Sequence, residues 1–216
     1  MLKQILQLLF PQKCVLCRKV LSARETDLCH SCRKTAPEFK FPKKNISFVA
    51  GWTAVWYYKG QGRESLHRFK FYNARSNGDV YGRLLAMRLL QEEKTDFDVL
   101  TWVPLSPLRR FRRGYDQGQL LAQAVGRALN RPATSTLRKH RHTPPQSNIQ
   151  DSAARRANVL GAYRAVHPEN IQGKRILLMD DIITTGATVS ECARVLLTAG
   201  AKEVICAAVA ATEHKG

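Results

Sequence analysis

Acidic residues are scarce in this chain. Its 216 residues include 17 Asp and Glu against 35 Lys and Arg, which gives a formal net charge of +18. This excess of one sign is more than solubility requires, and it indicates a polyanionic or phosphorylated partner. The imbalance is greatest between Thr101 and Asn158, where eleven Lys and Arg accompany only Asp116 and Asp151. A solvated basic surface is the alternative interpretation, but the lack of acids here favours a surface that faces phosphate.

Long apolar runs and a P-loop are also missing. No stretch approaches the roughly 18 residues of a membrane-spanning helix, and Met1–Pro11 has no small-residue cleavage site. We therefore expect a cytoplasmic protein. The leucine-rich Met1–Pro11 predicts an amphipathic helix that packs on the protein or makes a peripheral contact with a membrane. Without a GxxxxGKS/T loop, Asp180 and Asp181 are not part of a P-loop nucleotide hydrolase.

Apolar runs alternate with helical patterns after residue 50. Strands are expected at Gly51–Tyr58, Val99–Val103, Ile176–Met179 and Val204–Val209. Amphipathic helices are expected around 62–71, 80–89, 120–129 and 189–199. This order predicts an α/β fold with a parallel sheet and helices on its faces, and ligand sites should lie beyond the carboxyl ends of the strands. The loops after Val103 and Met179 are therefore the expected sites.

Two CxxC motifs precede that region. Cys14 and Cys17 form the first and Cys29 and Cys32 the second, and each motif can fill two corners of a tetrahedral zinc site. Disulfides are the alternative, but a cytoplasmic setting favours metal. A site closed by four thiolates leaves no position for water, so the zinc is expected to be structural. His30 is an alternative ligand.

The proline- and lysine-containing run Phe39–Asn45 resembles a linker. We therefore place a boundary near residue 45, with an N-terminal helix and zinc module at 1–45 and an α/β domain at 46–216. Basic residues around the cysteine ligands make nucleic acid a candidate partner of the module, and solvated charge is the equal alternative. Two further cysteines, Cys192 and Cys206, lie in apolar patterns and are expected in the core.

A strand–turn–helix pattern with two acids occupies Arg175–Ser190 (RILLMDDIITTGATVS). A Thr/Gly turn at a helix N-terminus offers backbone N–H groups and hydroxyls to a phosphate, and the carboxylates of Asp180 and Asp181 can accept hydrogen bonds from a ribose diol. The pattern therefore predicts a ribose 5-phosphate site. A purely structural strand–turn–helix is the alternative. A dinucleotide fingerprint at Gly60–Ser65 is weak because its third glycine is missing.

Three further motifs, taken with the paired cysteines, resemble one family over nearly the whole chain. They are VPLSPLRRFRRGYDQ at Val103–Gln117, RRANVLGAYR at Arg155–Arg164 and LLMDDIITTGATV at Leu177–Val189. These motifs are similar to type I phosphoribosyltransferases and specifically to the ComF family, in which a four-cysteine zinc module precedes a phosphoribosyltransferase-like domain. The resemblance implies a parallel sheet with helices on both faces.

The resemblance also implies roles for single residues. Asp180 and Asp181 would be the catalytic pair that binds the ribose hydroxyls of phosphoribosyl pyrophosphate (PRPP). The residues that would hold the 5-phosphate are Thr184, Thr185, Gly186, Ala187 and Thr188.

The loop after Val103 would meet pyrophosphate together with Mg2+. Negative charge that builds up as pyrophosphate departs would be stabilised by the ion and by Arg109, Arg112 and Arg113. The stretch Thr134–Ala154, which contains Arg138, Lys139 and Arg141, corresponds to a flexible loop that closes over the reaction.

Few residues follow the expected strand Val204–Ala210, so no C-terminal hood for a nucleobase is expected. The aromatic residues that offer an alternative stacking surface, although strand aromatics are usually core, are Trp52, Trp56, Tyr57 and Tyr58. The resemblance implies binding of PRPP and single-stranded DNA and a role in DNA uptake for transformation. An active phosphoribosyltransferase of nucleotide salvage is the alternative. A third hypothesis is an adaptor that contacts other DNA-uptake proteins through Met1–Pro11.

Overall fold

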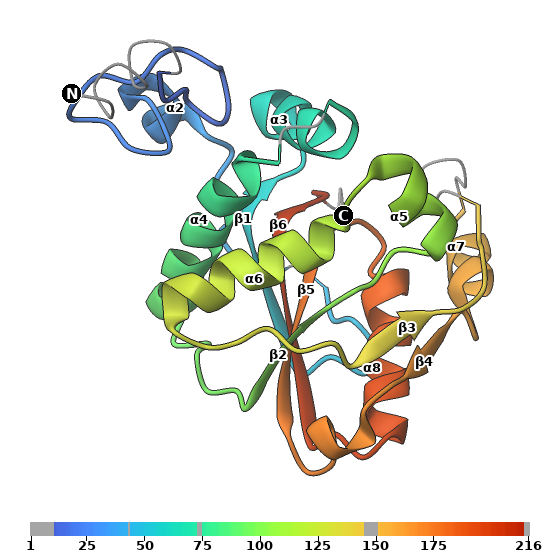
Figure 1. The fold of residues 1–216 in the computed structure, drawn as a ribbon. Coiled ribbons are helices and arrows are strands. Elements are labelled where there is room, and N and C mark those ends of the chain that lie inside the picture. Colours follow the sequence, from blue (N-terminus) through green and yellow to red (C-terminus); the bar gives the residue numbers. More distant parts are fainter. Residues whose placement is uncertain (1–10, 43, 73–74, 145–150, 214–216) are drawn as a thin grey trace.

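A four-stranded parallel sheet forms the centre of the chain (Figure 1). The computed structural model describes residues 11–42, 44–72, 75–144 and 151–213. In sheet order the strands are β1 (Gly51–Tyr57), β6 (Glu203–Ala211), β5 (Arg175–Ile183) and β2 (Val99–Trp102). All four expected strands are present, and β5 lies between β6 and β2. Because the strands are parallel, their carboxyl ends share one edge.

Side chains of β5 alternate between two hydrophobic cores. Leu177 and Met179 pack in one core, whereas Ile176 and Leu178 pack in the other. Successive strand residues point to opposite faces, so a strand inside a parallel sheet needs an unbroken apolar run. The run ends at Asp180, where the strand approaches the carboxyl edge of the sheet.

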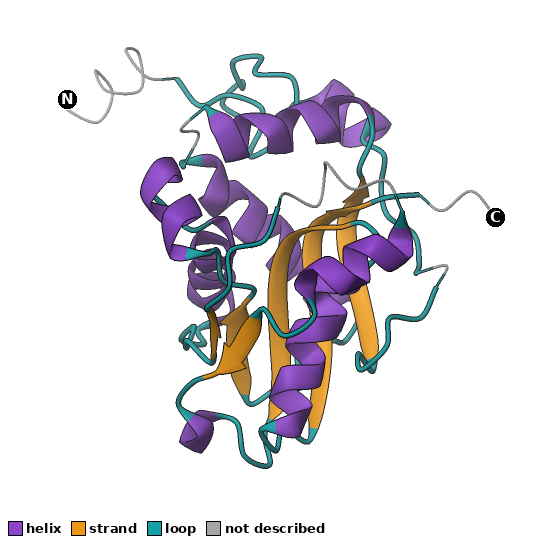
Figure 2. Cartoon of the chain, turned by 90° about the vertical axis from the view of Figure 1, so that its right-hand side faces the viewer, coloured by secondary structure: helices purple, strands orange, loops and turns teal. Residues whose placement is uncertain are grey.

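Helices cover both faces of the sheet, as Figure 2 shows. One face carries α3 (Gly60–Phe71), α4 (Asn77–Gln91) and α6 (Gln117–Leu129). The opposite face carries α8 (Ala187–Thr198) and the antiparallel pair of β3 (Leu137–Lys139) and β4 (Tyr163–Ala165). The other described elements are α2 (His30–Thr35), α5 (Pro107–Arg113), α7 (Ser152–Val159) and the 3-10 helix η2 (Pro168–Asn170). Within the described ranges, no helix combines the length and the apolar character that a membrane crossing needs.

Part of the stretch expected as a flexible loop is regular structure. Within Thr134–Ala154, strand β3 pairs with β4, and the buried Thr136 donates a hydrogen bond of 2.7 Å to Thr101 of β2. For this part the expectation is wrong, because pairing with a distant strand leaves no local periodicity to detect. Residues 145–150 of the same stretch lie outside the described ranges, as do residues 1–10 of the expected N-terminal helix.

The cysteine module packs on α3 and α4. Leu16 of the module belongs to the same hydrophobic cluster as Leu66 of α3. The buried Ser65 hydroxyl donates to the Val15 carbonyl, and Arg68 donates to the same carbonyl at 3.3 Å. Ser65 is therefore part of the joint between module and sheet, which gives the Gly60–Ser65 pattern a structural role.

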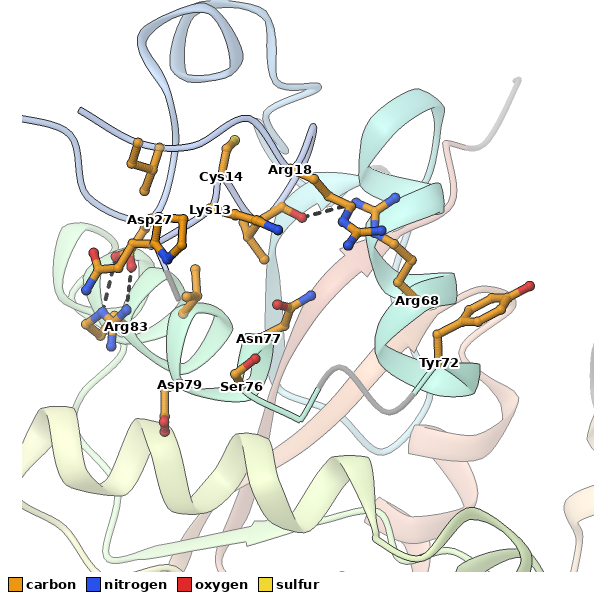
Figure 3. A pocket seen from close by; sticks show the side chains of 15 residues that line it. Lys13, Cys14, Arg18, Asp27, Arg68, Tyr72, Ser76, Asn77, Asp79 and Arg83 are labelled. Atoms are coloured by element: carbon orange, nitrogen blue, oxygen red, sulfur yellow. Dashed lines mark hydrogen bonds and ion pairs between the residues drawn. The ribbon is translucent and has the colours of Figure 1, made fainter. Parts of the chain in front are cut away.

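A cavity of about 720 Å3 lies in this joint (Figure 3). Asp27 of the module and Arg83 of α4 form an ion pair on one side of it. Arg18 of the module and Arg68 of α3 also line it. Charged side chains thus connect the module to the helices beneath it.

Helices α4 and α6 approach each other closely at Gly82. A Cβ atom at this position would lie 2.2 Å from the Cβ of Ala124 and 2.8 Å from its carbonyl carbon. The backbone of α6 cannot yield in the way that the end of a flexible side chain can. Glycine is therefore required where the two helices cross.

Replacing this glycine tests the packing of the two helices. Gly82→Ala should destabilise the protein by about 1–3 kcal/mol, since overpacking a filled contact displaces backbone. Gly51→Ala is the matched control, because a Cβ there meets nothing within 4 Å. Urea unfolding followed by circular dichroism measures both, and equal midpoints for the two variants would contradict the packing described.

Candidate functional site

The four CxxC cysteines lie together in the N-terminal module. Their sulfur atoms are all within 4.8 Å of one another, and those of Cys17 and Cys29 are 3.7 Å apart. Thiolates about 2.3 Å from one zinc ion lie roughly 3.8 Å apart in a tetrahedron. The cluster therefore has the size that zinc requires. Cys29 also caps α2 by accepting a hydrogen bond from the Cys32 amide at 3.5 Å.

His30 is not needed to complete this cluster. It is exposed, and its backbone amide donates to Glu25 at 2.6 Å. Among the described residues, the cysteines are the one group of three or more metal-ligating side chains with such spacing. Four thiolates leave no open position for water, so the zinc would be structural and would stabilise a module too small for a core of its own.

Asp180 and Asp181 lie near the carboxyl end of β5 and face different layers. Asp181 forms an ion pair with Lys70 of α3, with Nζ and Oδ1 2.9 Å apart. Asp180 lies on the side of α8 and the β3–β4 pair, where its charge acts on Lys139 and Tyr163. Burial, and then the charge of Asp181, raises the pKa of Asp180 to about 8. The structure therefore brings both acids to the edge but gives them different environments.

Lys139 belongs to the buried layer beside Asp180. Its side chain is 5% exposed, and Nζ lies 5.0 Å from the centre of the Tyr163 ring. Burial lowers the pKa of Lys139 to about 8. Lys139 therefore lies in a packed strand pair, where the sequence predicted a flexible loop. Arg138 is exposed, and Arg141 donates to the Leu160 carbonyl at 2.7 Å.

The loop after β2 is held in place by Asp116. This buried carboxylate accepts hydrogen bonds from the backbone amides of Leu105 at 2.8 Å and Gln119 at 3.2 Å, and so caps α6. Burial raises the pKa of Asp116. Its charge also acts on Asp180, which means that the loop after β2 and the end of β5 are neighbours, as expected.

The three arginines expected at pyrophosphate lie on α5 in different surroundings. Arg109 is partly buried and donates to the Thr143 carbonyl at 2.6 Å. Arg113 donates to the Gln117 side chain at 2.6 Å, and Arg112 is exposed. All three line one cavity. Arg109 alone acts on the same buried side chains as Asp180.

The Thr/Gly turn joins β5 to the N-terminus of α8. Gly186 is the N-cap residue with a φ of 81°, a backbone conformation that favours glycine. A Cβ there would lie 3.0 Å from Ile46. Thr184, Thr185 and Thr188 are half-buried. The turn thus presents hydroxyls and the amides of a helix N-terminus beside the acids, an arrangement suited to a phosphate and a diol.

Two lysines reach the site from parts of the chain where the sequence indicated no role. Lys44 Nζ donates to the Thr184 carbonyl at 2.8 Å, and burial lowers the pKa of Lys44 to about 8. Lys70 pairs with Asp181. The sequence indicated only a linker and a helix at these positions. Since 140 residues separate Lys44 from Thr184, no local signal could have connected them.

Four aromatic residues were expected as stacking candidates: Trp52, Trp56, Tyr57 and Tyr58. The structure favours the core interpretation, because Trp52 and Trp56 are only 5% and 3% exposed and both tyrosines are half-buried. The large exposed rings near the site are instead Phe71 and Phe111.

Two family models match the chain. Residues 116–216 match the phosphoribosyl transferase domain, and residues 5–43 match the double zinc ribbon domain. The parallel sheet with its covering helices and the four-cysteine cluster agree with these matches. The protein is therefore of the class that joins a zinc ribbon to a phosphoribosyltransferase-type domain.

Relatives match over most of the length. The DNA utilization protein YhgH of Escherichia coli O6:H1 is 29% identical, over 90% of this chain and 94% of its own. Competence protein F of Haemophilus influenzae is 28% identical, over 90% of this chain and 95% of its own length. Competence protein ComFC of Bacillus subtilis is 29% identical, over 68% of this chain and 58% of its own length. The chain is thus similar to competence and DNA utilization proteins over most of its length.

Loss of the cysteine cluster should remove zinc and destabilise the whole chain. Cys32→Ser should abolish the single equivalent of zinc and lower the thermal midpoint by roughly 10 °C, because loss of a structural metal costs about 4 kcal/mol or more. Cys192→Ala is the control, since Cys192 is buried in the core outside the cluster. Metal analysis by mass spectrometry and a melting curve measure both effects. Full zinc content in Cys32→Ser would rule out this ligand set.

The raised pKa of Asp180 predicts a pH-dependent stability. The folded state keeps this proton up to about pH 8, whereas the unfolded state releases it near pH 4. The stabilising contribution of the bound proton is therefore complete below pH 4 and is lost as the pH rises to 8. Asp180→Asn should melt several degrees above wild type at pH 8.5, since about 1 kcal/mol shifts the midpoint by roughly 2–4 °C.

This difference should shrink as the pH falls towards 5. Melting curves between pH 5 and 9 test the expectation, with the exposed Glu64→Gln of α3 as the control carboxylate. A constant difference between Asp180→Asn and wild type across that range would show that Asp180 does not retain its proton.

Proposed function

We propose that this chain binds PRPP at the β5–α8 turn and handles single-stranded DNA during uptake. The observation that carries the proposal is the pair Asp180 and Asp181 near the end of β5, two residues before a Thr/Gly turn at the N-terminus of α8. The ribose hydroxyls would donate to the carboxylates, and the α8 amides and threonine hydroxyls would hold the 5-phosphate. The phosphoribosyl transferase match over this segment supports the assignment.

Lysines and an arginine around the acids supply charge for the rest of PRPP. Lys44 is already hydrogen-bonded to the phosphate turn, and Lys70 would exchange part of its contact with Asp181 for the ligand. Arg109 of α5, whose charge acts on the same buried side chains as that of Asp180, would contact the pyrophosphate. Each is a cation with few ionic partners, so a multiply charged anion would be stabilised strongly.

Mg2+ would enter with the ligand. Oxygen atoms of carboxylates and phosphates are the ligands that it prefers. In the described part of the chain, the carboxyl edge does not form a group of three metal-ligating side chains, so pyrophosphate oxygens and water would complete its coordination. The ion would neutralise charge on pyrophosphate. The side chains of the protein would orient the ribose and exclude water from it.

The DNA part of the proposal rests on charge and on relatives. A net charge of +18 favours a nucleic acid, and the relatives are named for competence and DNA utilization. We place this activity in the cytoplasm, with DNA-uptake proteins as further partners. The adaptor hypothesis and a peripheral membrane contact depend on the segment Met1–Pro11, nearly all of which lies outside the described residues.

Removing both acids tests PRPP binding. The double variant Asp180→Asn with Asp181→Asn should bind PRPP about 100-fold more weakly, because a hydrogen bond contributes about 0.5–1.5 kcal/mol, and about 1.5–3 kcal/mol where one partner is charged. Isothermal titration with Mg2+ measures this. The matched control is Asp96→Asn with Asp98→Asn, two acids at the amino end of β2 that pair with Arg175. Unchanged affinity in the site variant would refute the assignment.

Turnover is a separate question from binding. Pyrophosphate release from PRPP with a panel of nucleobases, absent in the double variant, would identify the alternative function, an active phosphoribosyltransferase. Binding of PRPP without release would identify a ligand-responsive DNA-handling module.

A further inference from the structure

A second surface adjoins the proposed PRPP site where the end of α3 meets α5. A cavity of about 520 Å3 opens there. Its lining residues come from the last turn of α3, from α5 and from the residues that follow each helix, and they are Lys70, Phe71, Arg75, Arg109, Phe111, Arg112, Arg113, Gly114 and Tyr115. Five of these nine residues are cationic, and none is acidic.

The positive charge of this cavity is hardly compensated. Arg75 donates to the Gly114 carbonyl at 3.1 Å, and the acceptors of Arg109 and Arg113 are also neutral. Arg112 has no hydrogen bond or ion pair to any described residue. Lys70 alone among the lining cations faces a carboxylate. Guanidinium groups gathered around neutral acceptors can bind phosphates without first breaking an ion pair.

Aromatic rings stand among these cations. Phe111 is 87% exposed and Phe71 is 60% exposed. The Arg113 guanidinium lies 5.2 Å from the centre of the Phe71 ring, and that of Arg75 lies 4.8 Å from the centre of Tyr115. A single exposed phenylalanine is ordinary on a protein surface. Two exposed rings on the wall of one basic cavity, one of them with an arginine over its face, indicate a surface that binds a ligand.

Exposed rings interleaved with cations match the chemistry of an unpaired polynucleotide. Its bases offer faces that stack on aromatic side chains and guanidinium planes, and its phosphates neutralise lysine and arginine. A duplex keeps its bases paired and stacked. Its phosphates could bind the arginines, but its bases could not stack on the phenylalanines.

The geometry points to a stacking surface for single-stranded DNA, made of Phe71, Arg75, Phe111, Arg112 and Arg113. This inference rests on the proposed role in handling single strands, and it names the site. Bases stack on Phe71 and Phe111, and phosphates bind the three arginines. Lys70 lines the same cavity and pairs with Asp181, so the strand lies next to the proposed ribose contact.

Two double variants test the rings. Phe71→Ala with Phe111→Ala should weaken binding of a fluorescent 20-residue oligothymidylate by about 10-fold or more, since stacking on one aromatic side chain accounts for roughly fivefold to a hundredfold per base. Phe71→Leu with Phe111→Leu keeps apolar volume but removes the flat ring, so it should show a similar loss. Phe48→Ala is the control, because Phe48 is 52% exposed and precedes β1 at the amino edge of the sheet.

The salt dependence of DNA binding tests the role of the arginines. Arg112→Gln should reduce the slope of log affinity against log salt by about 1, because one fewer counterion is released. Arg127→Gln, an exposed arginine of α6 paired with Asp79, should leave the slope unchanged. A duplex of the same length should compete poorly with the oligothymidylate.

PRPP titration of the same samples separates the two proposals. Weaker DNA binding with normal PRPP binding in both phenylalanine variants supports the stacking surface. Wild-type DNA affinity in the leucine variant overturns it while leaving the proposed function intact. Equal competition by the duplex also overturns it. If the wild-type protein binds PRPP but no oligothymidylate, both the surface and the DNA part of the proposed function fail, and the PRPP part stands.

Discussion

The proposed site depends on the position of β5 inside a parallel sheet. A strand with neighbours on both sides and helices on both faces must be apolar along its length, and β5 is so up to Met179. Its carboxyl end is the first place where charge can be accommodated. The same constraint brings the loop after β2 and the N-terminus of α8 to this edge, since all of the strands run in one direction.

Strand geometry then divides the two acids between layers. Asp181 meets Lys70 on the side of α3, whereas Asp180 lies among buried groups on the side of α8. The edge therefore combines a carboxylate paired with a lysine and one whose ionisation is opposed by burial. The half-buried Lys44 and the buried Lys139, both with lowered pKa values, lie close by. A polar cluster of this kind is stabilised by a ligand that supplies both hydroxyl donors and negative charge.

The zinc module is joined to this arrangement at more than one point. Its loops pack on α3 through Leu16 and through the Val15 carbonyl, and α3 carries Lys70 in its last turn. The segment that leaves the module carries Lys44 to the phosphate turn. The module and the site thus share a helix and a connecting segment. A structural metal can in this way influence the position of site residues that it does not touch.

Local patterns in the sequence determined the elements that have strong local signals. Unbroken apolar runs predicted all four strands of the sheet, helical periodicity predicted α3, α4, α6 and α8, and the CxxC spacing predicted a cysteine cluster of the size that zinc requires. The β5–α8 turn was also evident, because its acids, threonines and glycine are adjacent in the chain. Short elements such as β3, β4 and α5 carry too few residues to show a period.

Contacts between distant residues were decided only by the tertiary structure. The packing of the layers leaves Trp52 and Trp56 buried but Phe71 and Phe111 exposed, although all four are aromatic residues in or beside regular elements. Folding also placed Lys44 on a turn 140 residues away. Composition and spacing determine which side chains are available and which secondary structure each segment favours. Which of them face water, and which meet one another, follows from how the layers pack.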